Sequence, residues 1–350
     1  MADPLVSVVV PTYNRAYCLE RTLASALSQT HRNLEIVIVD DGSTDATEEL
    51  ISTIRRRDAR VRYFKQPNKG VATARNAGFA QCSGEFIGLL DSDDVWRPWK
   101  IELQLACMTR FPDVGMIWTD MQAIDADGRE MSGAYLRPMY SAWDHFSVGN
   151  LFATQVPIGT FAPRFADEYG TRLFHFGEIF SEMLIGNLVH TPTALLRRSR
   201  LDKVGGFDES LCPAGEDYDF HLRTCREGPV GFIDLPTITY QVGMADALSR
   251  HAVSLSTNFL KVVTRTLSED RGRLHLSPDK IDWVLADANT WVGQVMLDEG
   301  DDMKARKHLA RSLRYRPFHA RTAKLAALAM MPPALRNTVR SLWAATKKRP

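Results

Sequence analysis

Several features that would place a sequence in a special class are missing from this chain of 350 residues. No stretch reaches the roughly 18 uninterrupted apolar residues of a membrane-spanning helix, so none is predicted. Residues Met1 to Pro4 carry no basic group, and the apolar run Leu5 to Val10 is too short for a secretory signal. We therefore expect a protein that is made and kept in the cytosol.

Cysteine is scarce, and two phosphate-binding patterns are absent. The five cysteines are scattered, odd in number and without CxxC spacing, which argues against a disulfide framework or structural zinc and indicates reduced thiols. The sequence contains neither the GxGxxG pattern of dinucleotide-binding folds nor the GxxxxGK(S/T) loop of NTPases. A dinucleotide cofactor and a P-loop are therefore both disfavoured.

Charge is balanced overall but divided unevenly along the chain. The formal net charge is +1, yet residues 301–350 contain 13 Lys and Arg against 2 Asp and Glu. That segment carries +11, and the rest of the chain carries −10. With 45% hydrophobic and 24% charged residues the composition is that of an ordinary globular protein, and the length allows one large domain or two smaller ones.

Strand-like and helix-like segments alternate over the first 120 residues. The expected strands cover 5–10, 34–39, 61–64, 85–90 and 114–119, and the expected helices cover 19–27, 45–54, 71–82 and 99–111. This order predicts an α/β fold with a Rossmann-like, mostly parallel central sheet flanked by helices on both faces. Ligands of such sheets bind at the carboxyl ends of the strands.

Polar side chains follow each of the first four expected strands. The segments are Pro11-Thr12-Tyr13-Asn14-Arg15, Asp40-Asp41-Gly42-Ser43, Asn68-Lys69-Gly70 with Arg75-Asn76 a helical turn on, and Asp91-Ser92-Asp93-Asp94. Because parallel strands end at one edge of a sheet, these groups should converge where a nucleotide would lie. Mg²⁺ and Mn²⁺ take oxygen ligands from one or two carboxylates and from phosphate, so a nucleotide with its diphosphate on a metal fits best.

The segment Asp91 to Asp94 is the most informative of these. The apolar run Phe86 to Leu90 stops on three carboxylates, which repel one another unless a cation sits between them. A bound divalent metal is one interpretation. The other is an Asp-rich turn that begins the next helix, with Asp94 as its cap and Pro98 near its first turn.

Seven stretches of the sequence resemble the glycosyltransferase family 2 enzymes of the GT-A fold. They are VSVVVPTYNR, EIVIVDDGSTD (35–45), NKGVATARNAG (68–78), FIGLLDSDD (86–94), HTPTALLRR (190–198), VGGFDES (204–210) and GEDYDFHLR (215–223). They keep the family's order over roughly residues 5–245. The resemblance implies the GT-A fold, a nucleotide-sugar donor and a divalent metal.

The resemblance also implies roles for individual carboxylates. Asp217 matches the base that takes a proton from the acceptor nucleophile, giving inversion in one displacement, and Glu216 is expected to orient the site. Asp93 matches the aspartate that contacts a Mn²⁺ or Mg²⁺ ion bridging both phosphates, and Asp94 is expected to be a ligand or a neighbour of one. From the residues alone, Asp217 could equally be part of an ordinary helix N-terminus.

On the donor side, Asp41 matches the carboxylate that contacts the nucleotide base, and Tyr13 matches the aromatic ring near it. Arg75 matches a basic residue near the diphosphate, and Asp91 matches one that holds ribose or metal-bound water. Tyr13 as a half-buried loop aromatic and Arg75 as a helix-surface residue are the simpler interpretations. The expected donor-binding residues are Pro11, Thr12, Tyr13, Asp41, Lys69, Arg75, Asp91 and Ser92.

Two departures from the family pattern matter. Many members carry a metal-ligating His where this chain has Gly243, which leaves the third protein ligand open; His251 is either its replacement or a surface residue. The QxxRW motif of processive polysaccharide synthases is also absent. Transfer of a single sugar is therefore the better prediction.

The chain is expected to divide near residue 250. Residues 1–250 would form the catalytic domain, with a nucleotide-sugar half over about 1–120 and an acceptor half over about 121–250. Residues 125–128 predict a hairpin, and 121–189 would line the acceptor site, form a lid or be plain scaffold. Residues 251–350 have helical periodicity at 255–267, 281–297 and 303–315 and would form a helical region with a basic tail.

The predicted function is that of an inverting, metal-dependent glycosyltransferase that moves one sugar from a nucleotide-diphosphate sugar to a glycan, lipid-linked or protein acceptor, in bacterial surface polysaccharide or glycoconjugate synthesis. Gly243 suggests the alternative of a non-catalytic nucleotide-sugar-binding or scaffold protein of the same fold. A nucleotidyltransferase is disfavoured, because its Gly-rich, Lys-containing N-terminal loop is missing. No nucleic-acid partner is expected, because aromatic and basic residues do not interleave.

The last segment sets Leu335, Val339, Leu342 and Trp343 on one helical face among basic residues, which is typical of a peripheral helix on the anionic inner face of the plasma membrane. We predict that the purified chain binds anionic liposomes at low salt and that deletion of residues 333–350 abolishes binding. Co-sedimentation measures this, with neutral phosphatidylcholine liposomes as the control. Equal binding by the shortened chain would contradict the prediction.

Overall fold

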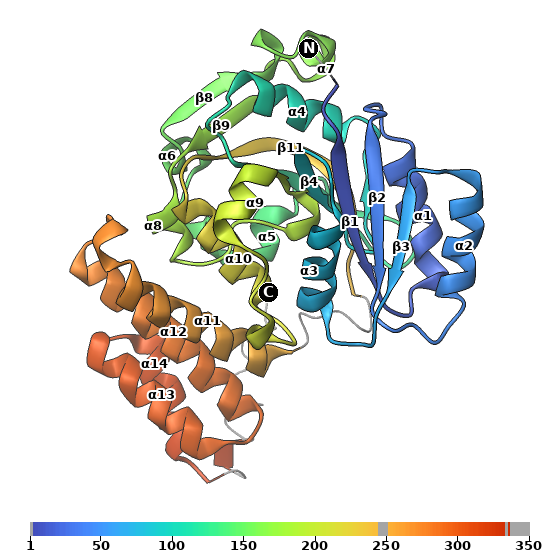
Figure 1. Ribbon diagram of the computed structural model, residues 1–350. Helices are drawn as coiled ribbons and strands as arrows, with labels where there is room; N and C mark the ends of the chain where they lie inside the picture. Colours follow the sequence, from blue (N-terminus) through green and yellow to red (C-terminus); the bar gives the residue numbers. More distant parts are fainter. Residues whose placement is uncertain (1–2, 244–250, 333–334, 337–350) are drawn as a thin grey trace. The chain divides into compact units, whose positions relative to one another are not determined.

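The computed structural model describes residues 3–243, 251–332 and 335–336. The chain divides into two compact units, residues 1–248 and 249–350 (Figure 1). Residues 337–350, which hold most of the predicted membrane-binding tail, lie outside the described part. Among the described helices, none combines the length and the hydropathy that a membrane span requires.

The first unit is built on one mixed sheet. Its main strand order is β3-β2-β1-β4-β10-β6-β11-β9-β8, while β5 pairs with β11 and β7 pairs with β6. The strands are β1 Val6–Thr12, β2 Leu34–Asp40, β3 Val61–Lys65, β4 Phe86–Leu89, β5 Val95–Trp96, β6 Met116–Ile124, β7 Glu130–Ser132, β8 Thr154–Pro157, β9 Leu173–Gly177, β10 Leu195–Arg197 and β11 Val230–Gln241.

The Rossmann-like part of the sheet is confirmed. Strands β3, β2, β1 and β4 are parallel, and every residue of β1 and β2 is buried, as expected for strands covered on both faces. Antiparallel β10 then joins β4 to β6, so the whole sheet is mixed. The predicted hairpin at 125–128 is the turn between β6 and β7, where the Asp125 N–H donates to the Arg129 carbonyl at 2.9 Å.

Helices cover both faces of the parallel strands. Figure 1 shows α3 on one side of β1–β3, with α1 and α2 on the other, as right-handed crossovers require. The close packing of α3 needs Gly78, because an added Cβ there would lie 2.4 Å from Val9 Cγ1. The helices of this unit are α1 Ala16–Leu27, α2 Thr47–Arg57, α3 Val71–Gln81, α4 Lys100–Arg110, α5 Leu136–Met139, α6 Val148–Leu151, α7 Ala166–Tyr169, α8 Phe180–Met183, α9 Arg198–Val204 and α10 Glu216–Arg226.

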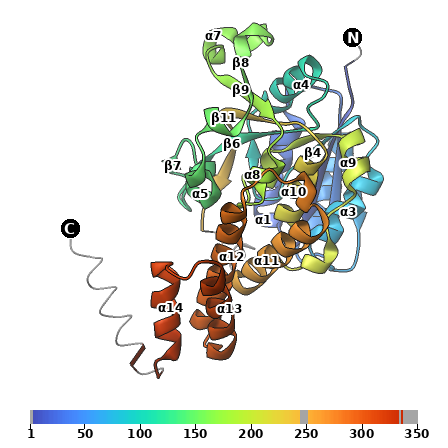
Figure 2. The ribbon, with the colours of Figure 1, turned by 90° about the vertical axis from the view of Figure 1, so that its left-hand side faces the viewer.

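The second unit is helical, as predicted, and Figure 2 shows its helices from a second direction. Its helices are α11 Ala252–Glu269, α12 Pro278–Asp298, α13 Asp302–Tyr315 and α14 Ala320–Met330. Val292 and Leu297 of α12, Leu309 of α13 and Leu328 of α14 share one apolar core. Since each amphipathic helix buries its apolar stripe against its neighbours, this unit has a core of its own.

Candidate functional site

The loops after the parallel strands are fixed by the predicted donor-side residues. Asp41, which follows β2, is 4% exposed and accepts hydrogen bonds from the backbone N–H of Lys69 at 2.9 Å and of Gly70 at 2.7 Å. Gly70 has φ +90° and directly precedes α3, so Asp41 sets where that helix starts. The Lys69 side chain itself is exposed.

The end of β1 has buried residues followed by an exposed aromatic side chain. Pro11 and Thr12 are buried in the strand, and the Thr12 hydroxyl has no hydrogen-bond partner among the described residues. Tyr13 is 47% exposed, which leaves its ring available for stacking. Asn14, at φ +52°, accepts a hydrogen bond from the Thr44 N–H at 2.8 Å, which ties the loop after β1 to the loop after β2.

Arg75 of α3 is the central cation of the site. Its guanidinium donates to Asp91 Oδ1 at 2.8 Å and to Glu216 Oε1 at 3.0 Å, and it lies 5.0 Å from the centroid of the Phe207 ring. Arg75 is 3% exposed, so the interpretation as a helix-surface residue is wrong. It joins the end of β4 to the start of α10, segments that are far apart in the sequence.

Asp93 and Asp94 form the remainder of the acidic turn after β4. Asp94 is 2% exposed, and Asp93 Oδ2 lies 3.8 Å from the guanidinium of Arg15. Burial and the charges of the neighbouring aspartates raise the pKa of both carboxyls. Helix α4 begins at Lys100 with Trp99 as its N-cap, so Asp94 does not cap it. The carbonyl of Ser92, also buried, accepts a hydrogen bond from Thr22 Oγ1 at 3.0 Å.

Glu216 and Asp217 open α10, as the sequence predicts. Burial, reinforced by the Asp217 charge and opposed by Arg75, raises the pKa of Glu216 to about 7. Burial also raises the pKa of Asp217, whose Oδ2 accepts a hydrogen bond from Asn187 Nδ2 at 3.2 Å. Taken as a whole residue, Asp217 is less buried than Glu216.

His190 is the main site residue that sequence reasoning missed. Its Nε2 lies 3.8 Å from Asp94 Oδ2, its Nδ1 lies 3.2 Å from the Tyr140 hydroxyl, and its ring meets Tyr240 edge to face. Burial lowers the pKa of His190, although the nearby charges of Asp91, Asp217 and Asp93 oppose that shift. His190 lies in the stretch HTPTALLRR, in which no local pattern marks it as a neighbour of Asp94.

The residues present fit a divalent cation held mainly by carboxylates and phosphate. Within the described ranges, no group of three or more His, Cys, Asp or Glu side chains is arranged as a metal-ligand shell. Asp93 and Asp94 nevertheless supply adjacent carboxylates whose mutual repulsion a cation would relieve. Mg²⁺ sites commonly have one or two carboxylates, with substrate phosphate completing the set.

The third ligand stays open at the two positions that the sequence suggested. Gly243 has φ +86° and an open environment, and it carries no side chain. His251 is exposed and directly precedes α11 in the second unit. His190 is the histidine that the described structure places beside Asp94.

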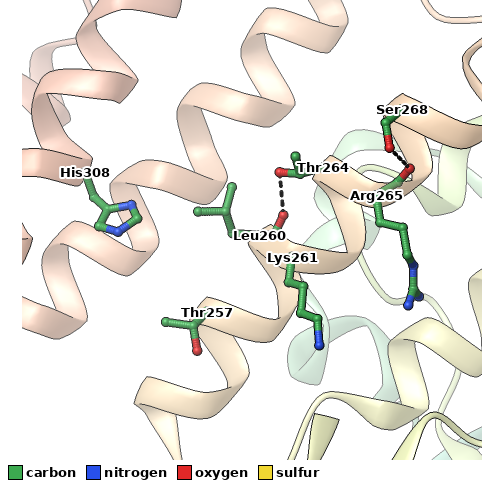
Figure 3. A pocket seen from close by; sticks show the side chains of 7 residues that line it. All are labelled: Thr257, Leu260, Lys261, Thr264, Arg265, Ser268 and His308. Atoms are coloured by element: carbon green, nitrogen blue, oxygen red, sulfur yellow. Dashed lines mark hydrogen bonds between the residues drawn. The ribbon is translucent and has the colours of Figure 1, made fainter. Parts of the chain in front are cut away.

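A cavity of about 520 Å³ in the second unit offers different chemistry (Figure 3). It is lined by α11 and by His308 of α13. The hydroxyls of Thr264 and Ser268 donate to carbonyls of their own helix, at 2.8 Å and 2.7 Å. No carboxylate is among the lining residues, which are Thr257, Leu260, Lys261, Thr264, Arg265, Ser268 and His308. This cavity is therefore not the donor site.

The chain belongs to glycosyl transferase family 2, whose model matches residues 7–205. It is 39% identical over 138 residues to a chondroitin synthase of Escherichia coli, and 38% identical over 138 residues to a hyaluronan synthase of Pasteurella multocida. Each match covers 39% of this chain but only 20% and 14% of the two synthases, respectively. The matched segment thus corresponds to a small part of these longer relatives.

Solved structures agree on the fold. S. aureus TarS 1-349, in complex with UDP-GlcNAc, is 17% identical, with a TM-score of 0.59 over 92% of this chain and 84% of that one. A mannosyltransferase from Pyrobaculum calidifontis, in complex with GDP-Man and Mn²⁺, is 18% identical, with a TM-score of 0.50 over 97% of this chain and 88% of that one. At these identities the likeness shows the GT-A fold alone.

The raised pKa of Glu216 predicts a pH dependence of stability. The folded chain keeps this proton up to about pH 7, whereas an unfolded chain releases it near the ordinary pKa of 4.5. Between these values the folded state binds more protons, so this group lowers the free energy of unfolding as pH rises from about 4.5 to 7. Glu216→Gln removes that titration.

Urea unfolding between pH 4.5 and pH 8 measures this effect. The free energy of unfolding of the wild-type chain, minus that of Glu216→Gln, should decrease steadily as the pH rises and then level off above about pH 7. The control is Glu20→Gln, which changes an exposed carboxylate on α1 and should give a flat difference. A flat difference for Glu216→Gln as well would contradict the assignment.

Proposed function

We propose that this chain is an inverting, metal-dependent glycosyltransferase that moves one sugar from a nucleotide-diphosphate sugar to an acceptor. The observation that carries the proposal is the convergence of the acidic turn after β4 with Asp217 at the start of α10. His190 Nε2 lies 3.8 Å from Asp94 Oδ2, and the charge of Asp217 acts on the pKa of His190. Arg75 bridges the same two segments. On this proposal, the residues that hold the diphosphate and the residue that accepts the proton lie on neighbouring segments.

On this proposal, Asp93 and Asp94 hold Mn²⁺ or Mg²⁺ together with the donor diphosphate. The ion would neutralise the negative charge that develops on the nucleoside diphosphate as it leaves. Arg75 acts by positioning, because its guanidinium is already engaged by Asp91 and Glu216. Asp41, Tyr13 and the remaining donor-side residues hold the nucleotide at the ends of β1 and β2.

Asp217 is proposed as the catalytic base. The residue as a whole is only partly buried, and Asn187 holds one oxygen of its carboxylate, so an acceptor hydroxyl could be bound beside it. Burial raises its pKa, which makes the carboxylate a stronger general base as long as it stays ionised. Attack from the side opposite the leaving diphosphate then inverts the anomeric carbon. Glu216 keeps α10 in place through Arg75.

The biological setting is proposed from the matched relatives and from the charge of the C-terminal residues. The similarity to chondroitin and hyaluronan synthases favours a polysaccharide or glycoconjugate pathway of a bacterial surface. The missing QxxRW motif favours transfer of one sugar, and the +11 charge of residues 301–350 favours a peripheral position at an anionic membrane. A non-catalytic nucleotide-sugar-binding protein is the second candidate, because Gly243 provides no ligand.

Substitution of the base separates these two functions. After a screen of nucleotide sugars has identified the donor, Asp217→Asn should lower Mn²⁺-dependent transfer or donor hydrolysis by roughly 100- to 10,000-fold while donor binding is retained. The matched control is Asp202→Asn on α9, an exposed carboxylate that should leave both unchanged. No turnover of any donor by the wild-type chain, despite binding, would support the non-catalytic alternative.

The proposed ligand set also predicts cooperative binding of metal and donor. With two carboxylates as the principal protein ligands, Mn²⁺ alone should bind weakly, and the nucleoside diphosphate should tighten its binding at least tenfold, because phosphate oxygens complete the shell. Paramagnetic resonance titration of Mn²⁺ with and without UDP or GDP measures this. Asp93→Asn should remove the enhancement, and tight Mn²⁺ binding without nucleotide would contradict the proposal.

A further inference from the structure

A second cavity, of about 440 Å³, lies in the first unit. Its charged and large aromatic lining residues are Arg97, Trp99, Asp120, Tyr169, Arg172 and Asp234. None of the proposed donor-binding, metal-binding or catalytic residues lines it. Its volume falls within the range of ordinary small-molecule pockets, so it can be assessed as a binding site in its own right.

The cavity exists because β11 has two different neighbours along one edge. Ile233 of β11 pairs with Phe174 of β9, whereas Ile238 pairs with Trp96 of β5. Between these contacts the register of β11 shifts on both sides of Pro236. Asp234 to Pro236 therefore lack a paired strand on that edge and contribute to the cavity wall.

The residues that lead into α4 form one wall of the cavity. Arg97 and Trp99 lead into α4, and the Thr30 N–H, just after α1, donates to the Pro98 carbonyl at 2.7 Å. The start of α4 is thus tied to the α1 side of the sheet. Arg75 belongs to α3, which covers the other side.

Alternation along β6 separates the cavity from the Tyr240 ring, which contacts His190. Asp120 and Gln122 point to one face of this strand, and Ala123 points to the other. Gln122 accepts a hydrogen bond from Arg97 at 2.6 Å, which puts the cavity on the first of these faces. Ala123 is paired with Tyr240, whose ring contacts His190 of the carboxylate cluster.

The lining has two arginines and two aspartates, which differ in how they are paired. Asp234 is paired with Arg137 at 3.0 Å. Among the described residues, by contrast, no carboxylate lies within ion-pair distance of the exposed guanidiniums of Arg97 and Arg172. Asp120 is 1% exposed; one of its oxygens accepts from the Met121 and Leu136 N–H groups, and the other has no partner in the described structure. Two guanidiniums at a cavity rim match the planar geometry of a carboxylate or a phosphate.

Two aromatic rings complete the lining. Trp99 and Tyr169 lie with their centroids 5.1 Å apart and their planes tilted by 42°. Rings of this kind pack against apolar C–H surface while their polar atoms reach hydroxyl groups, and a pyranose ring presents both. The carboxylate of Asp234 can accept hydrogen bonds from hydroxyls at the same place.

We infer that this cavity binds a saccharide unit that carries one anionic group, with the anion at Arg97 and Arg172 and the sugar ring against Trp99 and Tyr169. The inference concerns a second site and does not require the transfer reaction to occur. On the proposed function, it would hold a charged sugar of a glycan away from the reacting end.

Saturation-transfer NMR on the full chain tests the inference with three matched probes, glucuronate, glucose 6-phosphate and glucose. At least one of the two anionic sugars should saturate the protein, and glucose should bind at least tenfold more weakly, since a charged hydrogen bond contributes about 1.5 kcal/mol or more. A preference between glucuronate and glucose 6-phosphate tells whether the anion is a carboxylate or a phosphate.

Variants locate the binding. Arg172→Gln should weaken binding of the preferred anionic sugar about tenfold, and the double variant Arg97→Gln/Arg172→Gln should abolish it. Both residues are exposed, so the fold should persist, and an unchanged thermal midpoint checks this. Arg129→Gln, at an exposed arginine outside the cavity, is the control and should change nothing.

Three results would overturn the inference. One is the lack of saturable binding of either anionic sugar up to about 50 mM, well beyond millimolar affinity, which would mean a hydrated structural cavity only. The second is equal binding of glucose. The third is full binding by the double variant. Because none of these readouts uses donor turnover, failure of the inference and failure of the proposed function remain distinguishable.

Discussion

The site depends on one buried guanidinium, that of Arg75. It donates hydrogen bonds to Asp91 and Glu216, which lie on segments far apart in the sequence; Arg75 and Glu216 are buried, and Asp91 is half-buried. Burying these charges is costly, and removing one partner from such a set typically costs about 3–5 kcal/mol because the others stay buried without it. The interaction therefore holds the end of β4 and the start of α10 in one relative position. That position is the one that brings the acidic turn and Asp217 together.

Arg75 also divides the carboxylates into two kinds. Asp91 and Glu216 have a permanent cationic partner, whereas Asp93 and Asp94 are left with a distant arginine and a histidine whose pKa is lowered by burial. Burial raises the pKa of both carboxyls of the second pair, and the charges of the neighbouring aspartates add to that shift. On the proposed function, a divalent ion relieves the repulsion between these aspartates and the donor diphosphate completes its ligand set.

The sequence predicted the parallel strands, their helices and the acidic residues at the strand ends, because each depends on local pattern. It could not predict β10 as the strand between β4 and β6, since its three residues are too few to show a period. Burial of Arg75 and the approach of His190 to Asp94 depend on contacts between segments more than 90 residues apart. No local signal encodes such a contact. The role of residues 121–189 could not be predicted for a related reason: their strands and helices are mostly only three to five residues long.

Alternate side chains of strand β6 point to opposite faces of the sheet. Asp120 and Gln122 belong to the cavity side, whereas Ala123 is paired with Tyr240 on the side of the carboxylate cluster. Because this alternation has a period of two, insertion or deletion of a single residue in β6 would send each following side chain to the wrong face. Asp120 resists such a slip, since its carboxylate is anchored to the N–H groups of Met121 and Leu136. In related chains β6 should accordingly tolerate changes of side chain far better than changes of length.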